Sequence, residues 1–223
     1  MPLKTHAPDA RQIYFFYPNI IGYARVILSL VSFCLLGHMP GVFLACYTAS
    51  FVLDAADGMV ARAFDQCSNF GAVFDMLTDR ASTAGFLVVL DHVMQPAPGW
   101  FTTLCACLVF LDVASHFCRM YVSLYMRKTS HKDVGDSLFS LLRLYYSNRK
   151  FMGALCIGQE FSYLLLYAYR MYGDVQGVQQ YLLPLLLITG LLNALKQVVN
   201  VQQLLDGMHR LAVMDAKERA TTK

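Results

Sequence analysis

Runs of hydrophobic residues alternate with short polar segments along most of the chain. An α-helix needs about 20 apolar residues to cross the hydrocarbon core of a bilayer, and each run is long enough to do so. The predicted spans are residues 19–37, 41–62, 70–93, 100–126, 151–172 and 181–205. We therefore expect an all-α, polytopic membrane protein with six transmembrane helices.

The segments outside these spans have a different composition. Residues 1–18 include a run of aromatic residues just before Pro18, which is typical of an interfacial helix at the level of the lipid headgroups. Residues 127–150 are polar and basic, and predict a long loop with room for a surface helix. We expect an N-terminal interfacial segment up to residue 18, a six-helix domain over 19–205 and a solvated cytosolic tail over 206–223.

The composition supports this membrane assignment. Of the 223 residues, 57% are hydrophobic and 15% are charged, whereas soluble chains carry roughly 25% charged residues. The net charge of +3 is small and gives no indication of nucleic-acid binding. The seven cysteines have neither zinc-ligand nor redox spacing.

Lysine and arginine residues are unevenly distributed over the predicted connections. The connections after the first, third and fifth spans contain none, although Arg170 lies near the end of the fifth span. The basic residues outside the membrane gather in the other segments: Lys4, Arg11, Arg62, Arg127, Lys128, Lys132, Arg143, Arg149, Lys150, Arg210, Lys217, Arg219 and Lys223. The positive-inside rule therefore predicts that both termini face the cytosol.

Four aspartates interrupt the second and third spans, and the hairpin between these spans is expected to turn near Gln66. Asp57 and Asp75 each lie nine residues from that point, and Asp54 and Asp79 lie twelve and thirteen residues away. At a rise of 1.5 Å per residue, both pairs lie roughly 13 to 20 Å along their helices from the turn. Each pair shares one helix face. We expect one cluster of four carboxylates that opens toward the cytosol.

Ionisable side chains at membrane depth are costly and usually mark functional sites. Four like charges in a low dielectric need neutralisation by protons or by cations. All-oxygen ligation suits Mg²⁺ or Mn²⁺, and four carboxylates can bridge two such ions. Two metal ions stabilise the attacking and leaving oxygens in phosphoryl or phosphatidyl transfer. The structural alternative is hydrogen bonding between the helices by protonated aspartates.

Small residues accompany the carboxylates. Gly58, Ala61 and Gly71 lie on or beside the same helix faces, where they leave room for a ligand to approach the backbone. Close packing of the two helices explains the same residues equally well. Arg62, one turn from Gly58, can pair with a diphosphate or can anchor the helix at the interface.

These residues belong to one longer pattern, which reads Asp54-x2-Asp57-Gly58-x2-Ala61-Arg62-x8-Gly71-x3-Asp75-x3-Asp79. The pattern resembles the signature of the CDP-alcohol phosphotransferase family at every fixed position. The resemblance implies six transmembrane helices, a homodimer, and displacement of CMP from a CDP-linked lipid by an alcohol. It also implies that the four aspartates bind divalent metal ions and that Asp79 is the general base. The resemblance places five residues around the CDP group: Asp57, Gly58, Ala61, Arg62 and Gly71.

Segments outside the signature resemble the eukaryotic members of this family whose acceptor is myo-inositol. The segments are PNIIGYAR (18–25), FGAVFDMLTDR (70–80), LDVASH (111–116), SHK (130–132) and LRLYYSNR (142–149). This resemblance implies that CDP-diacylglycerol and myo-inositol give phosphatidylinositol and CMP, in the membrane of the endoplasmic reticulum or the Golgi. In that reaction Asp79, near a metal ion, could accept the proton of an inositol hydroxyl.

Five further residues are candidates for the substrate pocket. Asp112 and His116 share a face of the fourth span, where they either line a polar pocket or pair with each other. Lys132 and Arg143 are candidates for inositol binding, or serve only the membrane topology. Asn19 either caps the first span or contacts the nucleotide.

Two other functions stay open at this point. Another member of the same family would use glycerol 3-phosphate, serine or an amino alcohol as its acceptor. A phosphorylated acceptor would need several convergent cations, and the scattered lysines and arginines do not decide this. A carrier of cations or protons would use the same aspartates, but it would also need a polar route through the bilayer.

Overall fold

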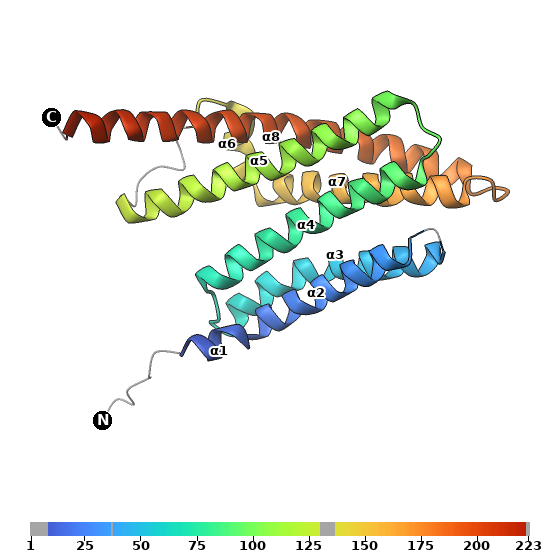
Figure 1. Cartoon of the computed structure of the whole chain (residues 1–223), viewed down its shortest axis with the longest axis horizontal. Coiled ribbons are helices and arrows are strands. Elements are labelled where there is room, and N and C mark those ends of the chain that lie inside the picture. The colour runs from blue at the N-terminus through green and yellow to red at the C-terminus, as the bar shows by residue number, and fades with distance from the viewer. Residues whose placement is uncertain (1–8, 37, 130–136, 222–223) are drawn as a thin grey trace. The chain divides into compact units, whose positions relative to one another are not determined.

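The computed structural model describes residues 9–36, 38–129 and 137–221, which form helices and their connections and no strand (Figure 1). In chain order the helices are α1 (Ala10–Tyr14), α2 (Tyr17–Cys34), α3 (Pro40–Ala63), α4 (Asn69–Val93), α5 (Gly99–Thr129), α6 (Ser140–Ser147), α7 (Arg149–Tyr172) and α8 (Gln179–Thr221). The prediction of an all-α protein is confirmed for this part of the chain.

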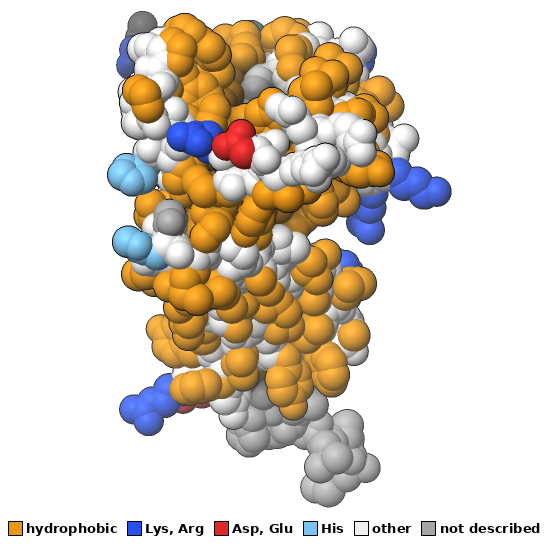
Figure 2. All heavy atoms as spheres, turned by 90° about the vertical axis from the view of Figure 1, so that its right-hand side faces the viewer, with side chains coloured by type: hydrophobic (Ala, Val, Ile, Leu, Met, Phe, Trp, Pro, Cys, Tyr) orange, Lys and Arg blue, Asp and Glu red, His pale blue; other side chains and the backbone are white. Residues whose placement is uncertain are grey.

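Five of the described helices are long and apolar enough to cross a membrane: α2, α3, α5, α7 and α8. Large hydrophobic side chains cover much of the surface, as the face in Figure 2 shows. The prediction of a multi-pass membrane protein is confirmed. Helix α4 has 25 residues, which is long enough to cross a membrane. Its four charged residues, however, make it too polar to count as a span by composition. The sixth span therefore stays a prediction.

Two segments are more helical than the sequence analysis expects. Helix α8 continues to Thr221 instead of ending near residue 205, because residues 206–221 contain no proline and are rich in strong helix formers. Its last turns are exposed, as expected for the tail. Within the predicted loop 127–150, α5 extends to Thr129 and α6 forms the surface helix.

The chain divides into two compact units, one up to Gly85 and one from Phe86 onward. In the first unit α2 packs along α3, and the start of α4 joins them. The tight connection between α3 and α4 includes Asp65 with φ of 52°. Ser68 is the last residue of this connection. Its Oγ atom accepts a hydrogen bond from the Gly71 N–H at 3.0 Å and so caps the N-terminus of α4.

The second unit contains the rest of α4 and helices α5 to α8. Helix α8 packs against both α5 and α7, and α6 lies on α7 and α8. A hydrophobic core forms where α6, α7 and α8 meet, with Leu142, Tyr145, Leu155 and Val199 buried. The backbones of α5 and α8 come close at Gly207, where an added Cβ would lie 2.6 Å from the Cys118 Sγ atom.

The close contact at Gly207 gives a test of this packing. Gly207→Ala should lower the free energy of unfolding by about 1–3 kcal/mol, because the added methyl group overpacks the α5–α8 contact. Gly190→Ala in the same helix meets no atom within 4 Å, and should be neutral or stabilise the protein by about 0.5–1 kcal/mol. Thermal unfolding of both variants in detergent measures the difference. Equal effects at the two positions would contradict the packing described here.

Candidate active site

The hairpin of α3 and α4 brings aspartates from both helices together. Asp54 and Asp57 lie on α3, and Asp75 and Asp79 lie on α4. One carboxylate oxygen from each of Asp54, Asp57 and Asp75 lies within 4.8 Å of the other two. Asp79 is not part of this group of three, but it shares with the other three aspartates a contact to one cation.

That cation is Arg25 of α2, the one charged residue of this helix. Its Nη1 atom donates to Asp57 Oδ2 and to Asp75 Oδ1, both at 2.6 Å. Its Nη2 atom pairs with Asp54 Oδ1 at 2.5 Å and with Asp79 Oδ1. The guanidinium group thus contacts all four carboxylates.

Three serines form hydrogen bonds close to Arg25 and link its helix to α3 and α4. Ser50 Oγ of α3 donates to the backbone carbonyl oxygen of Arg25 at 3.0 Å. Ser29 Oγ lies 3.0 Å from both Ser50 Oγ and Ser82 Oγ, so hydroxyl groups link α2 to α3 and to α4. Such hydrogen bonds between helices replace those that water would make outside a membrane.

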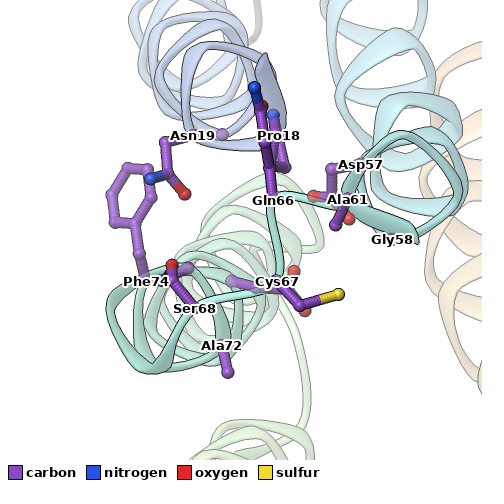
Figure 3. A pocket seen from close by; sticks show the side chains of 13 residues that line it. Pro18, Asn19, Asp57, Gly58, Ala61, Gln66, Cys67, Ser68, Ala72 and Phe74 are labelled. Carbon is purple, nitrogen blue, oxygen red and sulfur yellow. Dashed lines mark hydrogen bonds between the residues drawn. The ribbon is translucent and has the colours of Figure 1, made fainter. Parts of the chain in front are cut away.

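A pocket opens beside the carboxylates (Figure 3). Its walls come from α2, α3, the α3–α4 connection and the first turns of α4. Its volume is about 550 Å³ when the open, solvent-filled space at its mouth is counted with it. The lining residues are Pro18, Asn19, Gly22, Asp57, Gly58, Ala61, Gln66, Cys67, Ser68, Gly71, Ala72, Phe74 and Asp75. Two of the four aspartates therefore face a cavity that small residues keep open.

The glycines of the pocket have two different roles. A Cβ at Gly71 would lie 3.0 Å from Asn19 Oδ1 and 3.2 Å from Ser68 Oγ, so this glycine lets α2 and α4 approach each other. A Cβ at Gly58 would meet Arg62 Nη1 at 3.4 Å, an ordinary contact distance. At Gly58 the missing side chain leaves space for a ligand rather than for a neighbouring helix.

Most of the residues predicted to bind the nucleotide lie at this pocket. Asp57, Gly58, Ala61 and Gly71 line it, and so does Asn19. The Asn19 side chain also donates to the Ile13 carbonyl oxygen at 2.5 Å, which ties α2 to α1. Arg62 is not a lining residue; its side chain is exposed and lies beside Gly58.

The other predicted substrate residues belong to the second unit or lie outside the described residues. His116 Nδ1 lies 2.8 Å from the Asp112 carbonyl oxygen and 3.7 Å from Asp112 Oδ1. The two residues therefore contact each other on α5, which was one of the two alternatives. Arg143 is exposed on α6, and Lys132 falls outside the described residues. Their part in a substrate pocket stays a prediction.

A buried ionic network in the second unit was not anticipated from the sequence. Asp206 of α8 pairs with Arg210 at 2.7 Å and with Arg119 of α5 at 3.9 Å. Arg119 lies 4.6 Å from the centre of the Tyr146 ring, and the Tyr146 hydroxyl donates to Gln203 Oε1 at 2.9 Å. Burial raises the pKa of the Tyr146 hydroxyl above its ordinary value, and the charge of Arg119 opposes this rise. The network joins α5, α6 and α8.

A second buried cation, besides Arg25, lies in α8 before Asp206. Lys196 is buried, its Nζ atom donates to Asn200 Oδ1 at 2.5 Å, and it lies 5.2 Å from the centre of the Tyr145 ring. The sequence shows Arg25 and Lys196 as charges within hydrophobic spans, and this was the signal that could have identified both as partners of buried groups.

The chain belongs to the CDP-alcohol phosphatidyltransferase family, because the sequence profile of that family matches residues 15–192. This confirms the family resemblance of the signature. The match includes the carboxylate cluster and the pocket beside it. It also includes Arg25.

Several relatives carry a more specific name. CDP-diacylglycerol–inositol 3-phosphatidyltransferase 1 of Arabidopsis thaliana is 45% identical over 159 residues, which cover 71% of this chain and 68% of the relative. The Homo sapiens protein named CDP-diacylglycerol–inositol 3-phosphatidyltransferase is 36% identical over 217 residues, 97% of this chain and 100% of the relative. The protein of that name from Candida albicans is 37% identical over 216 residues, 95% and 88% of the two chains. No solved structure matches this chain.

The ionic network around Asp206 predicts a large effect of a small substitution. Asp206→Asn should lower the free energy of unfolding by about 3–5 kcal/mol, because the change removes one partner of a buried ion pair and leaves the other charge uncompensated. Asp215→Asn, an exposed position on the same helix, should change it by less than about 0.5 kcal/mol. Chemical denaturation in detergent measures both. A stable Asp206→Asn variant would contradict the importance of the network.

Proposed function

We propose that this protein transfers the phosphatidyl group of CDP-diacylglycerol to myo-inositol, which gives phosphatidylinositol and CMP. The observation that carries the proposal is the convergence of the signature residues on one pocket, with Asp57 and Asp75 at its wall. The names of the relatives from three kingdoms support inositol as the acceptor. The inositol-type segments that flank the signature support it as well.

We infer that Asp54, Asp57, Asp75 and Asp79 hold divalent cations. The donor set consists of carboxylate oxygens, which suits Mg²⁺ or Mn²⁺, and three of them lie close enough to share an ion. Four carboxylates with Arg25 and Arg80 carry a formal net charge of −2, and this remaining negative charge can attract divalent ions. When bound, these ions would offset the negative charge of the diphosphate during transfer.

In this proposal the pocket binds the CDP group of the donor. Gly58 and Ala61 present little side chain, so the nucleotide can lie against the backbone of α3. Arg62 lies beside Gly58 and can pair with the diphosphate. Asn19 of α2 lines the same cavity (Figure 3), where its amide oxygen, which lies beside Gly71, would be the group to accept a hydrogen bond from the nucleotide.

Asp79 is the proposed general base. An inositol hydroxyl is a weak nucleophile until it gives up its proton, and a carboxylate within reach can accept that proton. The hydroxyl oxygen then forms a bond to the β-phosphorus of the donor, and the bond from that phosphorus to CMP breaks. The electron pair of the broken bond leaves with CMP. Arg62 would stabilise the charge that develops on the transferred group.

The surroundings of the site follow from the substrates. Diacylglycerol chains stay in the bilayer while inositol arrives from water, which favours a site near the cytosolic membrane surface. We propose that both termini and the site face the cytosol, that the protein resides in the endoplasmic reticulum or Golgi membrane, and that it acts as a homodimer. Lys132, Arg143, Asp112 and His116 stay candidates for substrate binding.

The acceptor can be tested directly. Purified protein with Mn²⁺ or Mg²⁺ and CDP-diacylglycerol should release CMP when myo-inositol is added, and chelation with EDTA should abolish the release. CMP and the lipid product are quantified by chromatography. Release with serine or glycerol 3-phosphate, but none with inositol, would identify a different acceptor within the family. Release without any acceptor or metal would contradict the proposed chemistry.

The base can be tested with a matched pair of variants. Asp79→Asn should lower kcat by about 10²–10⁴-fold, because the amide cannot accept the proton of the attacking hydroxyl. Asp65→Asn makes the same chemical change in the exposed α3–α4 connection, where asparagine tolerates the positive φ, and should leave kcat unchanged. Initial rates of CMP release measure both. Activity in Asp79→Asn equal to that of Asp65→Asn would exclude Asp79 as the base.

A further inference from the structure

Arg25 is the most unusual residue of the first unit. It is the one charged residue in an otherwise apolar helix, and its side chain is only 4% exposed. The carboxylates around it are more accessible, up to 44% exposed for Asp75. Arg25 is thus more buried than the aspartates that surround it, and it is not among the residues that line the pocket.

The contacts of Arg25 use only half of the available carboxylate oxygens. One oxygen of each aspartate faces the guanidinium group: Asp54 Oδ1, Asp57 Oδ2, Asp75 Oδ1 and Asp79 Oδ1. The second oxygens of Asp54, Asp57 and Asp75 do not contact Arg25 and can bind another cation. The second oxygen of Asp79, Oδ2, already lies 3.4 Å from Arg80 Nη2 at the edge of the cluster. An arginine side chain keeps its charge in proteins, so the charge of Arg25 is permanent. Arg25 alone lowers the formal charge of the four carboxylates from −4 to −3 before any metal ion binds, and Arg80 lowers it further.

We propose that Arg25 is a built-in counter-ion, which holds the four carboxylates together in the absence of divalent cations and leaves one oxygen each of Asp54, Asp57 and Asp75 for those cations. Like charges at this distance repel strongly in a low dielectric, so a cluster with no internal cation would separate its helices. With Arg25 as counter-ion, the α3–α4 hairpin stays closed without a bound metal ion.

The geometry favours arginine over lysine in this role. The planar guanidinium group places two Nη atoms side by side, and each of them contacts one aspartate of α3 and one of α4. Arg25 thus bridges both helices twice. The Ser50 hydroxyl, bonded to the Arg25 carbonyl oxygen, fixes the backbone from which the side chain extends. An ammonium group is compact and cannot span four carboxylates in this way.

The test uses the thermal stability of the full chain in detergent, with EDTA or with Mn²⁺ alone. In EDTA, Arg25→Met should lower the Tm by about 5–10 °C, because the carboxylates lose their cation. Addition of Asp54→Asn to Arg25→Met should recover at least half of this loss, since one repelling charge is removed. Mn²⁺ should raise the Tm of Arg25→Met by more than it raises the Tm of the unmodified protein. Arg62→Met, which removes an exposed arginine of the same hairpin, should leave the Tm in EDTA unchanged.

The double variant Arg25→Met with Asp54→Asn distinguishes a counter-ion role of Arg25 from a role in packing alone. If Asp54→Asn lowers the Tm of Arg25→Met further, Arg25 is not a counter-ion and the inference fails. If Arg25→Met alone does not fold, recovery of folded protein in the double variant supports the inference, and failure of both overturns it. The inference rests on the proposed metal centre only for the Mn²⁺ result. Rescue by Asp54→Asn without rescue by Mn²⁺ would support the counter-ion and count against the metal centre.

Discussion

The structure of the first unit depends on the neutralisation of four carboxylates that helices α3 and α4 bring together. The cluster persists only if positive charge lies among the oxygens, because like charges repel strongly in a low dielectric. Arg25 supplies part of that charge, because its Nη atoms lie 2.5–2.6 Å from carboxylate oxygens of three of the aspartates. Asp57 and Asp75 line the pocket, where the proposed divalent cations would offset the remaining negative charge and would in turn hold the diphosphate of the donor. The same electrostatic requirement thus links the buried arginine to the proposed metal centre.

The fold serves this arrangement with simple means. A short connection makes α3 and α4 antiparallel neighbours, so residues at equal distances from the turn become level. Helix α2 then covers the pair and supplies both Arg25 and, two turns earlier, Asn19 at the pocket. The second unit uses a comparable device, because Asp206 accepts contacts from Arg119 and Arg210 and is only 2% exposed. In both units a neighbouring helix supplies at least part of the charge that compensates a buried ionic group, and in the second unit Arg210 of α8 itself supplies the rest.

Much of this could be predicted from the sequence. The spacing of the aspartates around Gln66 located the cluster, because helical rise and the hairpin turn convert residue counts into depth. Arg25 was not assigned a role, since its partners lie 29 to 54 residues away in the chain and only the packing of α2 brings them together. The end of α8 was placed too early, because hydropathy marks where a helix leaves the membrane and not where its hydrogen bonds stop. The acceptor could be named only by resemblance, because no contact among the described residues identifies inositol as the ligand.

The central claim is that the carboxylate cluster and the nucleotide pocket form one metal-dependent site. The most direct measurement is the ³¹P relaxation rate of CMP in the presence of the protein and Mn²⁺. The account predicts a strong paramagnetic enhancement, because the phosphate binds next to the ion, and it predicts that Asp57→Asn removes the enhancement while Asp65→Asn does not. If CMP binds to the Mn²⁺-loaded protein without any enhancement, the nucleotide and the metal occupy separate places, and the account is wrong.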